Sequence, residues 1–245
     1  MQYLDLTFDT AERNLACDEA LLDLCEDGSS GEILRFWEPK DYFVVLGYSN
    51  KIKAEVAITS CKALGVPILR RPSGGGTVLQ GPGCLNYSLI LKIASEPRLK
   101  NLTGTNEFVL NRNCAALSDR GQVLNSDLSP IGIQGTSDLT LGARKFSGNA
   151  QRRKKNALLF HGTFLLNFDF SKISQCLAIP ARQPDYRQNR PHADFLTNIH
   201  LPGAAVKDAL RKVWRAEKKF SEIPHKKIAQ LVQEKYSRRN WNEKF

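Results

Sequence analysis

The sequence predicts an α+β fold. Three observations support this prediction: an amphipathic helix near the N-terminus, a series of short β-like runs, and apolar stripes with helical spacing near the C-terminus. Strands with short connections and helices at both ends do not give the regular βαβ alternation of a doubly wound fold. A chain of 245 residues can bury a substantial core. We therefore expect one α+β domain over residues 1–245.

The first helix is expected between residues 9 and 28. Asp9 and Glu12 have the spacing of a capping box, apolar residues follow at helical intervals, and Gly28 stands where a C-terminal cap belongs. A second helix is expected over residues 106–118, ended by Gly121. Two apolar stripes, over residues 206–214 and 228–236, predict the final helical region.

Between these helices, apolar runs with period-two alternation predict strands. The runs cover residues 33–37, 42–47, 66–70, 85–91, 137–142, 144–150 and 157–166. Their short connections favour a mostly antiparallel or mixed sheet.

Composition limits the class of protein. Hydrophobic residues make up 42% and charged residues 24%, which excludes a disordered chain or a coiled coil. The first ten residues lack the pattern of a signal peptide, and no run reaches the roughly 18 apolar residues of a membrane span. We expect a cytoplasmic protein without a membrane partner. The net charge of +10 predicts an anionic partner: nucleic acid, a phosphorylated ligand or an acidic protein.

The six cysteines lie far apart, without a CxxC pair or a histidine spacing that suits zinc. We expect reduced, mostly buried thiols.

The stretch "RRPSGGGTVLQGPG", residues 70–83, is the first candidate for a binding site. Consecutive glycines let a backbone turn tightly and present N–H groups at close range, and arginine and serine add donors for phosphate or carboxylate oxygens. These residues are Arg70, Arg71, Ser73, Gly74, Gly75 and Gly76. The stretch matches neither a P-loop nor the GxGxxG of a dinucleotide fold. A hairpin connection is the alternative reading.

A second candidate is "LGARKFSGNAQRRKKN", residues 141–156. Lys145 is followed by small polar residues, including Gly148, and preceded by Asp138, which could hold a metal ion or orient the lysine. A lysine beside an anion-binding loop can bridge a phosphate and an acyl oxygen as negative charge develops. Taken alone, a lysine between strand-like residues is usually a solvated side chain.

Together the two motifs resemble the catalytic domain of lipoate-protein ligases, in the superfamily that includes octanoyltransferases and biotin ligases. The resemblance extends from "DEALL" (residues 18–22) through "WEP" (37–39) to "QPDYRQNRPHADF" (183–195). It implies a fold like that of class II aminoacyl-tRNA synthetases and biotin ligases, a sheet flanked by helices. It also implies that lipoate and ATP, with Mg²⁺, form lipoyl-AMP, and that the lipoyl group then passes to a lysine of an acceptor protein.

The resemblance implies roles for individual residues. Lys145 matches the lysine that contacts the lipoate carboxylate and the α-phosphate. Arg71, Ser73 and the three glycines match the loop around the lipoyl-adenylate, and Thr77 and Val78 continue along the nucleotide. His161 falls in the family's "HGT" strand, although a core histidine is an equal alternative. Arg70 would add a cation for adenylation, and Leu46, Val78 and Leu79 could line an apolar slot for the lipoyl tail. No metal ligands are identified.

Two alternative functions remain. Octanoyltransferases use a cysteine nucleophile, but this chain has no cysteine between Leu124 and Gln151; Cys114 falls in an expected helix and Cys176 lacks the sequence context expected of that nucleophile. A nucleic-acid-binding protein would explain the net charge and "RRKK" (152–155), but no aromatic-interleaved basic strand accompanies the run. The "GRGRxxR" loop of biotin ligases is absent. We therefore expect a lipoate ligase, with nucleic acid an improbable partner.

Two features depart from the commoner ligase pattern. Gln80-Gly81 stands where many ligases have His-Asp, and the sequence stops near the end of a catalytic domain, so we expect no C-terminal accessory domain. In some relatives that piece is a separate protein, which is a candidate partner here. The expected acceptors are acidic lipoyl domains, of the 2-oxoacid dehydrogenase E2 or glycine-cleavage H type, which a basic surface would attract.

Overall fold

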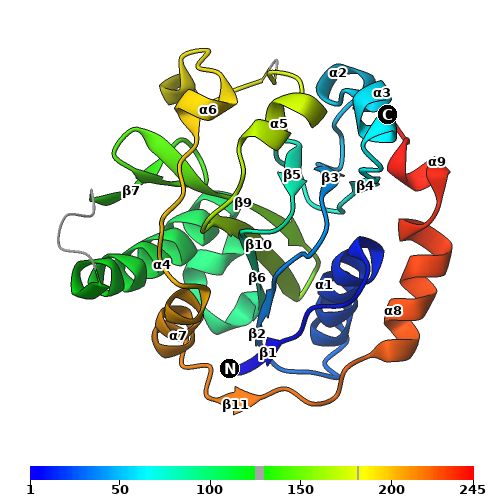
Figure 1. Cartoon of the computed structure of the whole chain (residues 1–245). Helices are drawn as coiled ribbons and strands as arrows, with labels where there is room; N and C mark the ends of the chain where they lie inside the picture. The colour runs from blue at the N-terminus through cyan, green and yellow to red at the C-terminus, as the bar shows by residue number, and fades with distance from the viewer. Residues whose placement is uncertain (125–129, 181) are drawn as a thin grey trace.

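A mixed eight-stranded sheet forms the centre of the protein (Figure 1). The computed structural model describes residues 1–124, 130–180 and 182–245. In the order of the sheet, the strands are β11 (Lys218–Lys219), β1 (Gln2–Asp5), β2 (Ile33–Trp37), β6 (Cys84–Lys92), β10 (Ala157–Leu165), β9 (Arg144–Arg153), β8 (Asp138–Leu141) and β7 (Ile131–Gln134). β1 runs parallel to both of its neighbours, and the other pairs are antiparallel.

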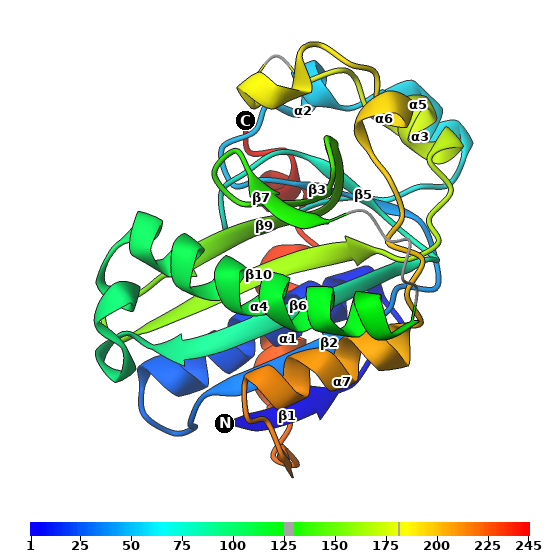
Figure 2. The same cartoon turned by 90° about the vertical axis from the view of Figure 1, so that its left-hand side faces the viewer.

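Helices cover both faces of this large sheet. Figure 2 shows α4 (Leu102–Leu124) and α7 (Gly203–Val213) lying across one face. α1 (Ala11–Glu26) packs on the opposite face, where α8 (His225–Leu231) lies beside it and continues into a π-helical turn over Val232–Tyr236. A mixed sheet flanked by helices is the architecture that the sequence predicted, so the predicted fold class is confirmed.

Alternation along β2 divides the apolar side chains between two cores. Leu34 and Phe36 are buried in the core beneath α4 and α7, whereas Ile33 and Trp37 are buried in the core beneath α1 and α8. Complete burial of a leucine or phenylalanine side chain contributes about 1.5–3 kcal/mol. A shift of one residue in register would exchange the two faces, so these residues fix the position of β2.

A second, three-stranded sheet lies at one end of the large sheet (Figure 1). It consists of β4 (Ile68–Arg70), β3 (Phe43–Leu46) and β5 (Val78–Gln80), with β3 parallel to β4 and antiparallel to β5. We call it the small sheet. The short helices at this end of the molecule are α2 (Ile52–Glu55), α3 (Ile58–Ala63), α5 (Ser171–Cys176), α6 (His192–Phe195) and α9 (Arg239–Asn242).

Two expectations about helix ends were wrong. Thr10, rather than Asp9, caps α1: its hydroxyl accepts a hydrogen bond from the Arg13 amide at 3.3 Å, and Asp9 instead pairs with the Arg13 side chain at 2.8 Å. Gly28 does adopt a positive φ of 84° just after α1. Gly121 does not end the second helix, which continues to Leu124. One glycine costs a helix about 1 kcal/mol, which packing of Val109 and Leu117 on the sheet can exceed.

The expected strands are all present, with ends shifted by a few residues. The strands β1, β7 and β11 and the short helices around the small sheet have too few residues to show a period, so the sequence does not predict them. None of the described helices combines the length and the apolar character needed to cross a membrane.

Arg70 joins the small sheet to the C-terminal segment. Its side chain is fully buried, and its guanidinium donates to the carbonyl oxygens of Gly47, Tyr48 and Asn50 at 2.8–2.9 Å. The same group donates to the carbonyl oxygens of Trp241 and Asn242 at 3.2 Å. One buried cation therefore satisfies backbone acceptors from two segments that are far apart in the sequence.

We predict that Arg70→Ala lowers the free energy of unfolding by about 3 kcal/mol or more, because buried carbonyl groups would lose a charged donor. Urea denaturation of the variant and the wild type measures the difference. The exposed Arg144 is the control, and its replacement by alanine should change stability by less than about 0.5 kcal/mol. Equal stability of Arg70→Ala and wild type would contradict this account.

Candidate active site

A cavity of about 500 Å³ lies between the small sheet, the α1 face of the large sheet and the segment after α5. The two sequence motifs meet in this cavity. Of the residues predicted from the sequence, those that line it are Arg71, Gly75, Gly76, Thr77, Val78, Asp138, Lys145, Gly148 and His161. Ser73 and Gly74 lie just behind the wall, in contact with Arg71. Arg70 points away from the cavity into the backbone contacts described above, so its expected place beside the ligand was wrong.

The glycine loop folds around the buried guanidinium of Arg71. Its Nη2 donates to the carbonyl oxygens of Gly74 at 2.7 Å and Gly76 at 2.8 Å, and its Nε donates to the Ser73 hydroxyl at 3.1 Å. Burial lowers the pKa of Arg71 to about 10, so the group is still charged at neutral pH. The loop is therefore an ordered wall of the cavity rather than a flexible hairpin connection.

Two glycines are needed for this packing. Gly75 has a φ of 86°, and a Cβ on Gly47 would lie 2.1 Å from the carbonyl oxygen of Gly75. The loop can approach the end of β3 this closely only because Gly47 lacks a side chain, and the positive φ of Gly75 favours glycine at that position.

His161 links the glycine loop to the large sheet. Its Nε2 lies 2.6 Å from the Ser73 hydroxyl. Burial, together with the nearby charge of Arg71, lowers the pKa of His161 to about 4. The imidazole is therefore neutral at pH 7. It lines the cavity while bonding to the Ser73 side chain, and its contact with a ligand stays a prediction.

Lys145 and Asp138 form an ion pair in the cavity wall. The Lys145 Nζ lies 2.8 Å from Asp138 Oδ1, and the other carboxylate oxygen accepts a hydrogen bond from the Tyr186 hydroxyl at 2.7 Å. Burial and the adjacent carboxylate raise the pKa of Tyr186, which keeps its hydroxyl protonated as a donor. The Lys145 side chain is 24% exposed, so its ammonium is held in position yet accessible from the cavity.

Gly148 provides the space that the Lys145 side chain occupies. A Cβ at this position would lie 2.7 Å from Lys145 Nζ and 2.8 Å from its Cε. The glycine that follows the lysine in the motif therefore determines where the ammonium lies.

The rest of the cavity wall combines apolar and polar side chains. Val78 and Leu79 line it as expected, but Leu46 is buried elsewhere, in the core between the small sheet and α5. Among the lining residues, Trp37 Nε1 and Ser88 Oγ are buried without a hydrogen-bond partner in the described part of the chain.

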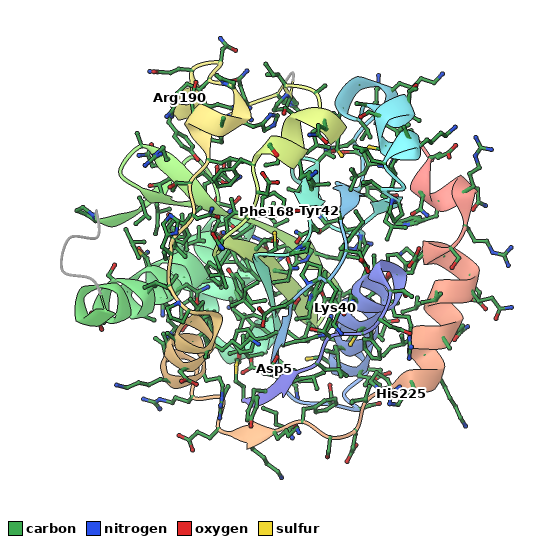
Figure 3. The ribbon with its side chains drawn as sticks, in the orientation of Figure 1. Asp5, Lys40, Tyr42, Phe168, Arg190 and His225 are labelled. Atoms are coloured by element: carbon green, nitrogen blue, oxygen red, sulfur yellow. The ribbon has the colours of Figure 1, made fainter. Side chains whose placement is uncertain are left out.

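The Gln80-Gly81 pair has a structural explanation. Gln80 donates to the Thr163 hydroxyl at 2.7 Å and accepts from the Asn86 amide at 3.0 Å, which joins β5 to the large sheet. A Cβ on Gly81 would lie 2.3 Å from the Tyr42 ring, which packs edge-on against Phe168 with centroids 5.9 Å apart (Figure 3). A side chain at position 81 would therefore displace an aromatic ring.

The cysteine side chains do not reach this cavity: all six lie in the described part of the chain, and none is among its lining residues. Five are buried, and the thiol of Cys61 lies 3.7 Å from the carbonyl oxygen of Cys176, in the core between the small sheet and α5. Burial raises the pKa of Cys17 and Cys25 to about 11, and that of Cys61 and Cys84 to about 12. At neutral pH these thiols are protonated, which makes them weak nucleophiles.

The basic run at residues 152–155 is partly used within the protein. Arg153 donates to Thr105 and Gln151, and Lys154 lies 2.5 Å from Asp23.

Sequence reasoning missed Tyr186, which holds Asp138, and Glu55, which accepts a hydrogen bond from Thr77. Tyr186 lies in "PDYR", within the stretch that resembles lipoate-protein ligases, but no spacing in the sequence links it to Asp138.

The fold thus brings a lysine and a glycine-rich loop into the wall of one cavity beside a mixed sheet. Residues 10–214 match the family described as "Lipoyl protein ligase A/B catalytic domain", and the chain belongs to this family. The predicted family is thereby confirmed.

Relatives in the family carry two different names. Octanoyltransferase LipM of Carboxydothermus hydrogenoformans is 28% identical, and the alignment covers 100% of this chain and 98% of the relative. Lipoate-protein ligase A subunit 1 of Thermoplasma acidophilum is also 28% identical, over 94% of this chain and 90% of the relative. A solved chain from the T. acidophilum bi-partite lipoate protein ligase and E2 lipoyl domain system has a TM-score of 0.80 at 22% identity, covering 99% of this chain and 96% of that chain. The chain is therefore an enzyme of the lipoate ligase and octanoyltransferase family.

We predict that Gly148→Ala lowers the rate of acyl transfer to an acceptor by about tenfold to 100-fold, because the new methyl group displaces the lysine ammonium from Asp138. The end of a lysine side chain can move, so the unfolding free energy should change by less than about 1 kcal/mol. Gly132→Ala is the matched control, since its methyl group would meet only Thr140 at 3.4 Å. Normal activity of Gly148→Ala would show that the ammonium position is unimportant.

Proposed function

We propose that the protein is an ATP-dependent lipoate-protein ligase. The observation that carries this proposal is that Lys145 and the Arg71-braced glycine loop line one cavity, whose described lining contains no cysteine. Such a site suits chemistry driven by positioning and electrostatic stabilisation, and it offers no thiol for a covalent acyl-enzyme.

In the first step, a carboxylate oxygen of lipoate attacks the α-phosphorus of ATP. The bond from the α-phosphorus to the bridging oxygen breaks, and pyrophosphate leaves with the electron pair. We propose that the Lys145 ammonium contacts both the carboxylate and the α-phosphate, and that Arg71 adds a second fixed positive charge. Charge that develops on the phosphoryl oxygens is thereby stabilised without a protein nucleophile.

Mg²⁺ is expected as the counter-ion of ATP. The described residues contain no cluster of three metal-ligating side chains. Mg²⁺ commonly binds through one or two carboxylates together with substrate phosphates, and Asp138 is the carboxylate beside Lys145 that fits this requirement. The ion would neutralise phosphate charge during the first step.

In the second step, the amine of an acceptor lysine attacks the acyl carbon of lipoyl-AMP, and AMP leaves. The net charge of +10 favours an acidic lipoyl domain as the acceptor, of the 2-oxoacid dehydrogenase E2 or glycine-cleavage H type. The T. acidophilum ligase is described as bi-partite, which motivates a separate accessory protein as a further partner.

The competing function is octanoyl transfer from a carrier protein without ATP, which is suggested by the name of the Carboxydothermus relative. Both functions use an acyl group and an acceptor lysine, so the test must separate them by their donor. We expect pyrophosphate release with lipoate and ATP, and lipoylation of an added lipoyl domain. Transfer of octanoate from its acyl carrier protein in the absence of ATP would contradict the proposal.

We predict that Lys145→Ala lowers the rate of lipoyl-AMP formation about 100-fold or more, because the ammonium acts on the developing phosphoryl charge. The fold should remain intact, since the side chain is partly exposed and packs in no core. Lipoate-dependent pyrophosphate release measures the rate, and Lys155→Ala, which removes an exposed lysine outside the cavity, is the control. Near-normal release by Lys145→Ala would remove this lysine from the mechanism.

A further inference from the structure

The segment of residues 183–197 crosses β9 at Lys145. Leu196 pairs with Lys145 as an isolated parallel bridge, and the Thr197 amide donates to the Lys145 carbonyl oxygen at 2.9 Å. Arg190, which Figure 3 shows beside α6, donates to the Ala143 carbonyl oxygen at 3.0 Å. Tyr186 is bonded to Asp138, as described above. The segment is therefore fixed over the reactive lysine at several points.

Arg187, in the short 3₁₀ turn Asp185–Arg187 of this segment, lines the cavity and is 4% exposed. Its Nε donates to the Arg190 carbonyl oxygen at 3.0 Å, and its guanidinium lies 4.7 Å from the centre of the Phe195 ring. These contacts fix the plane of the guanidinium. Its Nη2 is buried and has no hydrogen-bond partner within the described ranges.

No acidic side chain in the described residues forms an ion pair with Arg187. A buried cation without an anionic partner is costly, because it has lost its hydration without gaining an equivalent interaction. The neighbourhood does not compensate for this cost. Asp138 is already paired with Lys145 and Tyr186, and Arg182 adds another cation to the cavity lining.

His192 adds no negative charge and little positive charge. Burial and the nearby Arg187 lower its pKa to about 4, so the imidazole is neutral at pH 7. This end of the cavity therefore contains more cations than anions. Its chemistry suits a ligand with several negative oxygens, and a guanidinium is well matched to phosphate oxygens.

We propose that Arg187 binds the β- and γ-phosphates of ATP and stabilises pyrophosphate as the leaving group. This inference rests on the proposed ligase function. As the lipoate oxygen bonds to the α-phosphorus, the bond to the bridging oxygen breaks and its electron pair goes to pyrophosphate. Arg187 balances the charge that develops there, while Lys145 acts on the carboxylate and the α-phosphate. Arg187 thus acts on the leaving group, and Lys145 acts on the groups between which the new bond forms.

The test uses Arg187→Ala and Arg187→Lys with steady-state pyrophosphate release. We expect the KM for ATP to rise by about tenfold or more in Arg187→Ala, with the KM for lipoate changed less than about twofold. Arg187→Lys, which keeps the charge but loses the planar fork, should be intermediate. Arg144→Ala, an exposed arginine beside Lys145 and outside the cavity lining, is the matched control and should leave both KM values unchanged.

Direct titration of the protein with pyrophosphate gives a second readout. We expect wild type and Arg144→Ala to bind pyrophosphate equally, and Arg187→Lys to bind it several times more weakly. An unchanged KM for ATP, or an increase in the KM for lipoate instead, would overturn the role of Arg187. If wild type releases no pyrophosphate from ATP and lipoate, the ligase function itself fails. In that case, weaker binding of pyrophosphate by Arg187→Lys would still support an anion site at Arg187. Equal binding of pyrophosphate by Arg187→Lys and wild type would reject the anion site.

Discussion

The ammonium of Lys145 lies 2.8 Å from Asp138 in the wall of a cavity, and the site is organised around this ion pair. Gly148 leaves the space for the lysine side chain, Tyr186 holds the second oxygen of the carboxylate, and β8 and β9 bring the two residues together through antiparallel pairing. A charge fixed before the substrate arrives needs little reorganisation during the reaction, and its effect is larger where water is excluded. The fold places the glycine loop on the other side of the same cavity.

Much of this site could be predicted from the sequence, because glycine, lysine and serine in close order restrict what a loop can do. The sequence could not distinguish Arg70 from Arg71. The two arginines are adjacent, and successive residues at the end of a strand point in opposite directions. Arg71 consequently turns into the glycine loop, and Arg70 turns toward the C-terminal segment. A buried guanidinium requires hydrogen-bond acceptors, but which acceptors bind it depends on the three-dimensional structure.

Tyr186 and Arg187 illustrate a second limit. They lie about 40 residues after Lys145, in a segment without helix or strand periodicity, and reach the site because the segment from residue 183 returns over β9. A pattern within one element can be read from the sequence, but a contact between a turn and a distant strand depends on the whole fold. The middle of the large sheet was predictable for the opposite reason, because β6, β9 and β10, like α1 and α4, are long enough to show an apolar period.

Within the family, the absence of a cysteine from the described lining of the cavity separates two chemical routes. A transferase that forms an acyl-enzyme needs an accessible thiolate, whereas the six thiols here lie outside the cavity and four of them have a pKa raised by burial to about 11 or 12. An adenylate route needs cations and a place for phosphates, and the cavity provides Arg71, Lys145 and Arg187. The balance of charges at the site, more than the fold, therefore favours ATP as the source of activation.

Isotope transfer from lipoate tests this route most directly. When lipoate with ¹⁸O in its carboxylate is incubated with the protein, ATP and an acceptor lipoyl domain, one labelled oxygen should appear in AMP. The label moves because the carboxylate oxygen bonds to the α-phosphorus and remains there when the acceptor amine takes the acyl group. Mass spectrometry of the AMP measures the transfer. Lipoylated acceptor without labelled AMP would contradict the adenylate route and the central role given to Lys145.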